Sequence, residues 1–204
     1  MTVRHRLNRG GDRALNRAIH ASAMARMRSC PRTRAYVARR TAEEKTPREI
    51  RRCLKGYIAP ELYRQLTDNR TQLLAIVDDI APGLTSRYGI GPVTAAQAIV
   101  SFSHPGRCRN EAAFAALGGT SPLPASSGRT IRHRLNRGGD RALNRAIHAI
   151  ALTRMRSCPR TRAYVARRTA EGKTAREIRR CLKRYIAREL YRQLTQSMKP
   201  LTNP

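Results

Sequence analysis

The sequence predicts an all-α protein. Hydrophobic residues make up 40% of the 204 residues, aromatic residues only 4%, and Trp is absent, so the core must consist mainly of Leu, Ile, Val, Ala and Met. Ala-rich stretches with few runs of β-branched residues favour helix over strand. Apolar residues that recur on one side of each expected helix, together with recognisable helix-start signals, lead to the same fold class.

A long internal repeat organises the chain. Residues 2–67, named copy one here, recur at 130–195, named copy two, with a constant offset of 128. The copies differ at eight pairs of positions: Val3/Ile131, Ser22/Ile150, Met24/Leu152, Ala25/Thr153, Glu44/Gly172, Pro47/Ala175, Gly56/Arg184 and Pro60/Arg188. A solenoid has diverged repeats with a period of roughly 20–50 residues. Two near-identical blocks around a unique segment instead indicate a recent gene rearrangement, with a designed two-fold architecture as the alternative.

Each copy is predicted to contain three helices. In copy one, the first helix is expected over 12–28 with Asp12 as its N-cap, and Pro31 can then open the second helix. Thr46-Pro47-Arg48-Glu49 is a capping box that starts the third helix. The apolar pattern resumes near Glu61 and continues to residue 80. The same signals in copy two are Asp140, Pro159 and Thr174.

The unique segment contains a glycine-rich corner followed by a short helix. Gly89-Ile90-Gly91-Pro92 precedes an apolar helical stretch and resembles a helix-hairpin-helix, whose turn amides and helix N-terminus can receive a phosphate. The alternative is a tight corner between two packed helices. A further helix is expected over 110–117, and it ends at Gly118-Gly119.

A loop rich in Pro and Gly follows over 120–129 and presents the hydroxyls of Ser126 and Ser127. Five arginines surround or follow it: Arg129, Arg132, Arg134, Arg137 and Arg141. A serine becomes a nucleophile when a base accepts its proton, and guanidinium groups can stabilise the negative charge on a phosphate under attack. The pattern fits a phosphoryl-transfer site, although an ordinary loop has the same composition.

The charge of the chain indicates a polyanionic partner. The formal net charge is +29, and most of it lies in the copies: copy one has 17 Lys and Arg against 5 Asp and Glu, and copy two has 19 against 4. Nucleic acid is the expected partner, while a solvated basic face, a ribosomal-type RNA binder and a membrane-surface binder are alternatives. No stretch approaches the roughly 20 apolar residues of a membrane span, and we expect a cytoplasmic protein.

Several motifs in series resemble the C-terminal domain of DEDD-type insertion-sequence transposases, the family related to the pilin-gene invertase and to bridge-RNA-guided recombinases. The motifs are 89–96 (GIGPVTAA), 114–119 (FAALGG), Pro122, Ser126-Ser127-Gly128 and 137–143 (RGGDRAL). The resemblance covers roughly residues 70–195. It implies that Ser127, with Ser126 in reserve, is a nucleophile that joins covalently to a DNA strand end.

The family pattern also includes an N-terminal RuvC-like domain in which four acidic residues hold divalent metal. The chain departs from this pattern, because its first 67 residues repeat its C-terminal end and its unique segment holds only four acidic residues: Asp68, Asp78, Asp79 and Glu111. Five scattered Cys and five His show no zinc-site spacing. We therefore expect no metal or cofactor in this chain, and Mg²⁺ only in a RuvC-like domain supplied in trans.

These observations predict four regions: copy one (1–67), the connecting helix, corner and serine loop (68–129), copy two (130–195) and a disordered tail (196–204). The first functional hypothesis is a transposase C-terminal domain that uses serine in DNA strand transfer and is not active by itself. The second is an inactive remnant that binds nucleic acid without sequence preference. DNA is the expected partner, with a guide RNA, a second copy of the chain or the RuvC-like domain as further partners.

Overall fold

The computed structural model describes residues 12–121, 123–124, 133–134 and 138–198. Within these residues the regular structure is helical apart from two paired two-residue strands, so the all-α prediction is confirmed. The chain forms two compact units, Met1–Asn69 and Arg70–Pro204. Each unit is described separately.

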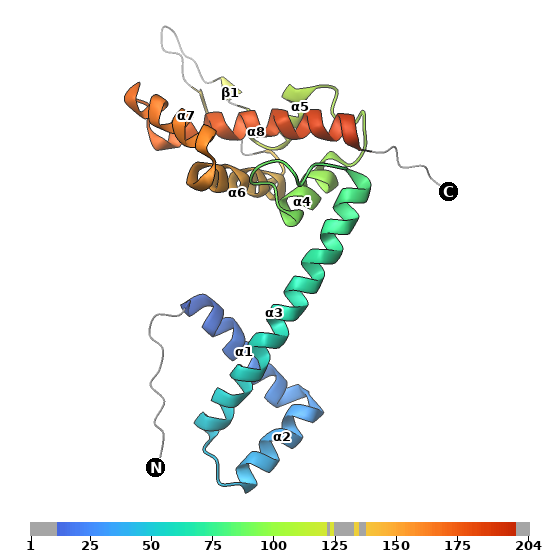
Figure 1. The fold of residues 1–204 in the computed structure, drawn as a ribbon, viewed down its shortest axis with the longest axis vertical. Helices are drawn as coiled ribbons and strands as arrows, with labels where there is room; N and C mark the ends of the chain where they lie inside the picture. The colour runs from blue at the N-terminus through green and yellow to red at the C-terminus, as the bar shows by residue number, and fades with distance from the viewer. Residues whose placement is uncertain (1–11, 122, 125–132, 135–137, 199–204) are drawn as a thin grey trace, which may run out of the picture. The chain divides into compact units, whose positions relative to one another are not determined.

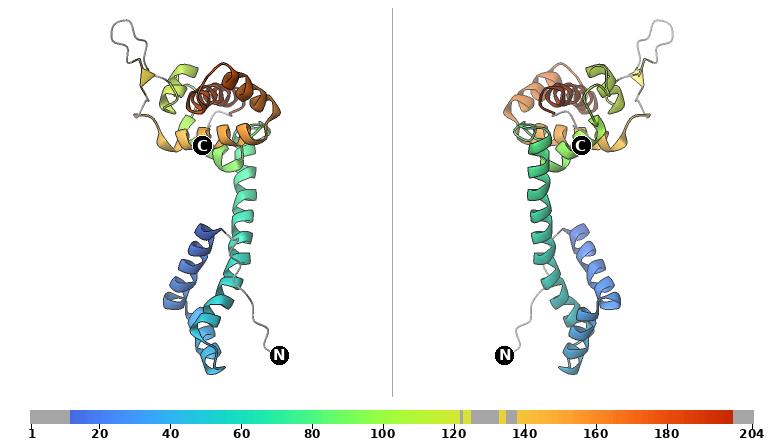
Figure 2. Two further views of the ribbon diagram at one scale, coloured as in Figure 1. Left: turned by 90° about the vertical axis from the view of Figure 1, so that its left-hand side faces the viewer. Right: turned by 90° about the vertical axis from the view of Figure 1, so that its right-hand side faces the viewer.

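The first unit contains α1 (Arg13–Ser29), α2 (Pro31–Ala42) and the first part of α3 (Pro47–Ile80). As predicted, the Asp12 carboxylate accepts hydrogen bonds from the amides of Ala14 (2.7 Å) and Leu15 (3.1 Å). Thr46 and Glu49 form the predicted capping box. Figure 2 shows α1 beside α3, and a small core joins them: Ala23, Ile50, Leu54 and Ile58.

α3 is continuous through Pro60, although the sequence indicated that the helical pattern only resumes near Glu61. A proline inside a helix removes one backbone hydrogen bond and strains the preceding turn. Ile58 is buried against α1, and Leu62 packs against the same cluster. Apolar contacts on both sides of the proline therefore hold the helix together.

The second unit contains the last turns of α3 and five helices: α4 (Pro92–Phe102), α5 (Glu111–Leu117), α6 (Arg141–Ser157), α7 (Pro159–Ala170) and α8 (Ala175–Ser197). α8 is the central element, with α5 on one side and α4 and α6 on the other (Figure 1). The edge-on contacts of Phe102 with Phe114 (centroids 5.9 Å apart) and with Tyr191 (6.0 Å) join α4, α5 and α8.

The core of this unit comes mainly from α3, α4, α5, α6 and α8. Fully buried residues include Val77 near the end of α3, Leu143 and Ile147 on α6, and Leu190 and Leu194 on α8. Apolar residues three and four apart make these stripes, as expected for helices that bury one face. No helix of the described residues has both the length and the apolar composition needed to cross a membrane.

Two details lie at the edges of the unit. β1 (Leu123–Pro124) pairs antiparallel with β2 (His133–Arg134), with Leu123 opposite Arg134. The C-terminal end of α8 differs from the prediction. We expected a disordered tail from residue 196, but Gln196 and Ser197 belong to α8 and Met198 is buried in the core. The apolar side chain of Met198 extends the buried stripe of α8 by one position.

Candidate nucleic-acid interface

The glycine-rich corner joins α3 to α4 and packs closely on α6. Gly89 has a φ of +77°, in the left-handed region that favours glycine. A Cβ atom on Gly89 would lie 3.2 Å from Cγ of Arg154 and 3.4 Å from the carbonyl oxygen of Ile150. Both the backbone conformation and the close approach to α6 therefore require glycine at this position.

Gly91 has a different role, because its φ of −94° is ordinary and no atom lies within 4 Å of an added Cβ. It is the N-cap of α4. Its amide donates to Oγ1 of Thr94 (3.1 Å), and the amide of Ile90 donates to the carbonyl of Arg87 (3.1 Å). Because these two turn amides already have partners inside the corner, the geometry favours the tight corner between packed helices over a phosphate-receiving turn.

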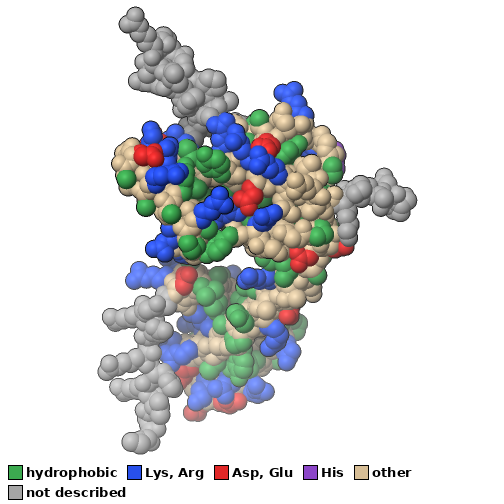
Figure 3. Space-filling view, turned by 45° about the horizontal axis from the view of Figure 1, so that its top comes forward, with side chains coloured by type: hydrophobic (Ala, Val, Ile, Leu, Met, Phe, Trp, Pro, Cys, Tyr) green, Lys and Arg blue, Asp and Glu red, His purple; other side chains and the backbone are tan. Residues whose placement is uncertain are grey.

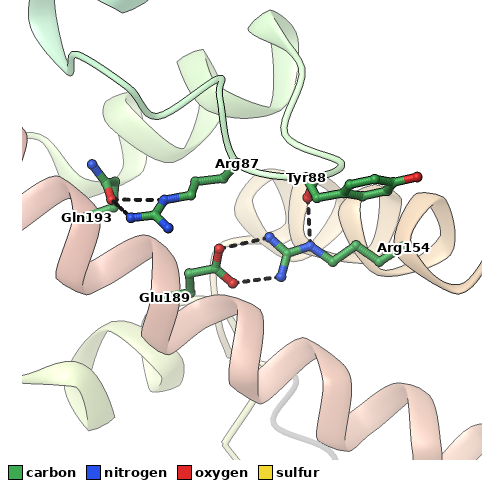
Figure 4. Close-up of polar contacts among 5 residues, drawn as sticks. All are labelled: Arg87, Tyr88, Arg154, Glu189 and Gln193. Atoms are coloured by element: carbon green, nitrogen blue, oxygen red, sulfur yellow. Dashed lines mark hydrogen bonds and ion pairs between the residues drawn. The ribbon is translucent and has the colours of Figure 1, made fainter. Parts of the chain in front are cut away.

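Two arginines tie the corner to the helices beneath it (Figure 4). Arg154 on α6 donates to the carbonyl oxygen of Tyr88 (2.7 Å) and to both carboxylate oxygens of Glu189 on α8 (2.6 and 3.0 Å). Arg87 donates through two nitrogens to Oε1 of Gln193 (3.2 and 2.9 Å). A guanidinium that binds a carboxylate through two parallel hydrogen bonds is strongly oriented. Arg154 therefore has a structural role that sequence reasoning missed.

The outer side of the corner is hollowed into an open depression of about 610 Å³. Its lining combines hydroxyl and guanidinium groups: Arg70, Thr85, Ser86, Arg87, Thr94 and Thr153. Tyr88 and Val93 add half-exposed or exposed apolar surface beside them. Polar donors, positive charge and an aromatic ring make a surface on which a sugar-phosphate backbone can lie.

The base of the serine loop is closely fixed at both ends. The amide of Asp140 donates to the carbonyl of Leu117 at 2.6 Å, which brings the start of α6 to the end of α5. A Cβ atom on Gly139 would lie only 2.6 Å from the amide nitrogen of Gly119. Gly139 is thus required for the close approach of its backbone to that of Gly119. The strands β1 and β2 pair further along the same two chain segments.

Asp140 anchors this junction electrostatically. Its carboxylate caps α6 by accepting from the amides of Ala142 (2.8 Å) and Leu143 (3.1 Å), and it also accepts from the hydroxyl of Ser101 on α4 (2.6 Å). The Ser101 hydrogen bond and these two amide hydrogen bonds lower the pKa of Asp140. Asp140 is therefore a structural cap whose carboxylate already accepts three hydrogen bonds.

The predicted site residues fall into two groups. Gly89, Gly91 and Arg141 lie in described residues, and Arg141 is exposed at the start of α6. Arg134 belongs to β2 through its backbone pairing with Leu123. The others lie outside the described residues: Ser126, Ser127, Arg129, Arg132 and Arg137. The structure thus brings Gly89 close to α6, and Arg141 lies at the base of the serine loop.

Figure 3 shows basic side chains at many places on the visible surface, more often than acidic ones. In copy two, a group of exposed arginines on α6, α7 and α8 makes none of the ion pairs found in the described residues: Arg141, Arg145, Arg156, Arg160, Arg162, Arg176, Arg180 and Arg184. Exposed positive charge without acidic partners is typical of nucleic-acid-binding proteins. Among the described residues no three His, Cys, Asp or Glu side chains group as a metal site would need.

Comparison with known proteins finds a family match within the second unit. Residues 81–166 match the model of the transposase IS116/IS110/IS902 family. Over 112 residues the chain is 33% identical to the insertion element IS110 uncharacterized 43.6 kDa protein of Streptomyces coelicolor. This alignment covers 54% of the chain and 28% of the relative. The resemblance predicted from the motifs is confirmed, because residues 81–166 match the IS110-type transposase family model.

Proposed function

We propose that this chain acts in DNA transposition as the DNA-binding C-terminal part of a transposase. The observation that carries the proposal is the overlap of the family match at 81–166 with the arginine-rich copy two, which starts at residue 130. Duplex DNA carries one negative charge per roughly 1.7 Å of axis, so a face with many free arginines gains affinity by releasing counterions.

The test of DNA binding is its dependence on salt. Each phosphate neutralised by the protein contributes about −0.9 to the slope of log affinity against log salt. Changing Arg141 and Arg145 to Gln should flatten the slope measured with a short duplex by about 1 to 2. Arg13 and Arg17 are the matching residues of copy one and are exposed on α1. The variant with both changed to Gln is therefore the comparison for the copy two variant. An affinity that does not depend on salt contradicts the proposal.

We further propose that Ser127 is the nucleophile, with Ser126 as the alternative. In this step the Ser127 hydroxyl loses its proton to a base and its oxygen attacks a backbone phosphorus. The phosphorus–oxygen bond to the departing strand breaks, and the departing oxygen takes up a proton and leaves as a hydroxyl. One phosphodiester thereby becomes a protein–DNA ester of similar energy. The arginines that follow the serine would stabilise the charge on the phosphate. Metal chemistry would come from a RuvC-like domain in trans.

A covalent adduct is the direct test of the serine proposal. The full chain, a nicked DNA substrate and a separate RuvC-like domain should give a protein–DNA species that survives denaturant. Ser127→Ala should abolish the adduct with little change in affinity, because one hydroxyl contributes little beside many arginine contacts. Ser126→Ala is the matched control and should retain it. Arg129→Ala or Arg132→Ala should slow its formation.

Other outcomes distinguish the competing functions. An adduct formed by the chain alone would show that it needs no metal domain in trans. Loss of the adduct in Ser126→Ala but not in Ser127→Ala would move the nucleophile by one residue. Absence of any adduct in the complete mixture, with DNA binding intact, would favour an inactive remnant that binds nucleic acid without sequence preference. Adding candidate guide RNAs to the same mixture tests whether RNA is a further partner.

A further inference from the structure

A partly buried lysine lies between α6 and α8 without an acidic partner. The ammonium group of Lys183 donates to Oδ1 of Asn144 at 2.6 Å, and Nδ2 of Asn144 donates to the carbonyl of Gly118, also at 2.6 Å. Burial lowers the pKa of Lys183. An ammonium group has three donors, and Asn144 accepts from one of them. The structure therefore holds Lys183 near the C-terminal end of α5, and two of its ammonium hydrogens make no hydrogen bond to Asn144.

Two further basic groups lie one helical turn from the hydrogen-bonded pair of Lys183 and Asn144. His148 lies one turn after Asn144 on α6, and Arg179 lies one turn before Lys183 on α8, so each pair shares a helix face. Burial lowers the pKa of His148, and the positive charges of Lys183 and Arg179 lower it further. The positive charges of Lys183 and Arg179 thus both act on the imidazole of His148.

This cluster has no carboxylate to balance it. All 13 Asp and Glu residues of the chain fall in the described ranges, and none of them forms an ion pair with Lys183, Arg179 or His148 there. Removing charge from water without a partner is unfavourable. A bound anion would supply the missing charge, and a phosphate has several acceptor oxygens for the remaining donors.

The position of the cluster indicates which phosphate it would take. Gly118, whose carbonyl holds Asn144, ends α5, and the chain then leads through Gly119 toward the serine loop. We propose that Lys183, His148 and Arg179 form a phosphodiester-binding site at the base of the serine loop, which holds the DNA strand on the transposase domain. The identity of the ligand as DNA rests on the proposed function, whereas the site itself rests on the geometry of α5, α6 and α8.

Copy one provides a control with the same local sequence. Asn16, His20, Arg51 and Lys55 repeat the four residue types at the same spacing. No helix equivalent to α5 belongs to that unit in the described residues, no hydrogen bond from Lys55 to Asn16 is found there, and His20 is exposed. The site in copy two therefore depends on the Gly118 carbonyl and on burial between packed helices, and copy one should not reproduce it.

The experiment follows the imidazole protons of the full chain by NMR during pH titration, with and without a 12-nucleotide single-stranded DNA. A phosphate held within about 4–6 Å should raise the pKa of His148 by about 1 unit or more. Lys183→Met should reduce this rise to less than half and weaken DNA binding several-fold. Lys183→Arg, which keeps the charge, should largely retain both, and Lys55→Met should leave both unchanged.

The outcomes separate the site from the proposed function. An unchanged His148 response in Lys183→Met, an equal effect of Lys55→Met, or an equal rise at His20 would overturn the site while leaving salt-dependent DNA binding in place. A chain that shows no salt-dependent DNA binding would overturn the proposed function instead. The RNA oligonucleotide of the same sequence is a second arm: a response to both supports a phosphodiester site, and a response to RNA only overturns DNA as its ligand.

Discussion

Copy one and copy two share nearly all of their sequence and form the same three helices, but they differ in what surrounds them. Their inner contacts are equivalent. Tyr36 and Tyr57 lie edge-on with centroids 6.3 Å apart, and the matching pair in copy two, Tyr164 and Tyr185, lies 6.2 Å apart. The buried residues between the helices also match: Ile50, Leu54 and Ile58 in copy one, and Ile178, Leu182 and Ile186 in copy two.

The outer faces of the two copies differ sharply. Leu143 and Leu194 are fully buried in copy two, because α4 and α5 cover that face. The matching residues of copy one, Leu15 and Leu66, are 57% and 67% exposed. Identical side chains thus belong to a core in one place and to the surface in the other. Local sequence determines the three-helix motif, and the neighbouring helices determine which of its faces is buried.

One sequence difference between the copies matches this difference in burial. Ile150 is the only described position of copy two that both differs from copy one and is buried. Copy one has Ser22 there. A serine in place of a buried isoleucine loses apolar contact area and brings a hydroxyl that needs a partner. Copy one is therefore less suited to pack against α4 than copy two is.

The largest difference in stability between the two units should come from replacing Leu143 in copy two and its counterpart Leu15 in copy one. Leu143→Ala should destabilise the second unit by about 2–5 kcal/mol, because it leaves a cavity in a closed core. Leu15→Ala should change the stability of the first unit by no more than about 0.5 kcal/mol. Hydrogen exchange of amides in α6 and α1 measures the opening free energy of each unit separately. Equal losses in the two units would show that copy one buries the same face as copy two.

The next largest difference in stability should come from two matching ion pairs, Arg154–Glu189 in copy two and Arg26–Glu61 in copy one. Arg154→Met removes hydrogen bonds to Tyr88 and Glu189 from a side chain that is 13% exposed, and we expect a loss of about 1.5–3 kcal/mol. Arg26 makes the equivalent contact with Glu61 at 2.6 Å but is 36% exposed. Arg26→Met should therefore cost less than about 1 kcal/mol. Thermal unfolding followed by unit-specific NMR signals tests this, and a costlier Arg26→Met would contradict it.

A smaller difference, which depends on pH, is expected at the helix caps. Asp12→Ala should cost about 1 kcal/mol as the loss of an N-cap, and Asp140→Ala about 1–2 kcal/mol because the Ser101 contact is lost as well. The pKa of Asp140 is lowered by folding, so its contribution is complete above the ordinary Asp pKa near 3.9 and disappears as pH falls through the lower folded value. The cost of Asp140→Ala should accordingly shrink below about pH 4. A cost that stays constant down to pH 2 would contradict the cause given for the lowered pKa.

The smallest difference should occur at the capping boxes. Thr46 and Thr174 each exchange hydrogen bonds with a Glu three residues later, with the same distances in both copies. Replacing either Thr with Ala should cost about 1 kcal/mol in its own unit, and the two costs should be equal. Hydrogen exchange of the amides in the first turns of α3 and α8 measures both. A clear inequality would show that the surroundings of a helix also affect its exposed cap.

Parts of the candidate site were predictable from sequence and parts were not. The motifs predicted the resemblance to the transposase family, the need for glycine in the corner and the position of Arg141, because each depends on residues close together in the chain. Arg154, Ser101 and Lys183 were missed. Their partners, Glu189, Asp140 and Asn144, lie 35–39 positions away, and no local pattern marks such pairs.

The sequence by itself determined the repeat, the positive charge and the starts of the helices in both copies. A helix start depends on hydrogen bonds between residues no more than four apart, such as those of Asp12 and Asp140 with the amides that follow them. Only the tertiary structure decided that Leu143 is core while Leu15 is surface, and that Lys183 is held near Gly118 while Lys55 is not. Burial depends on elements that the chain brings together over long separations, so two copies of one sequence can differ in every property that burial controls.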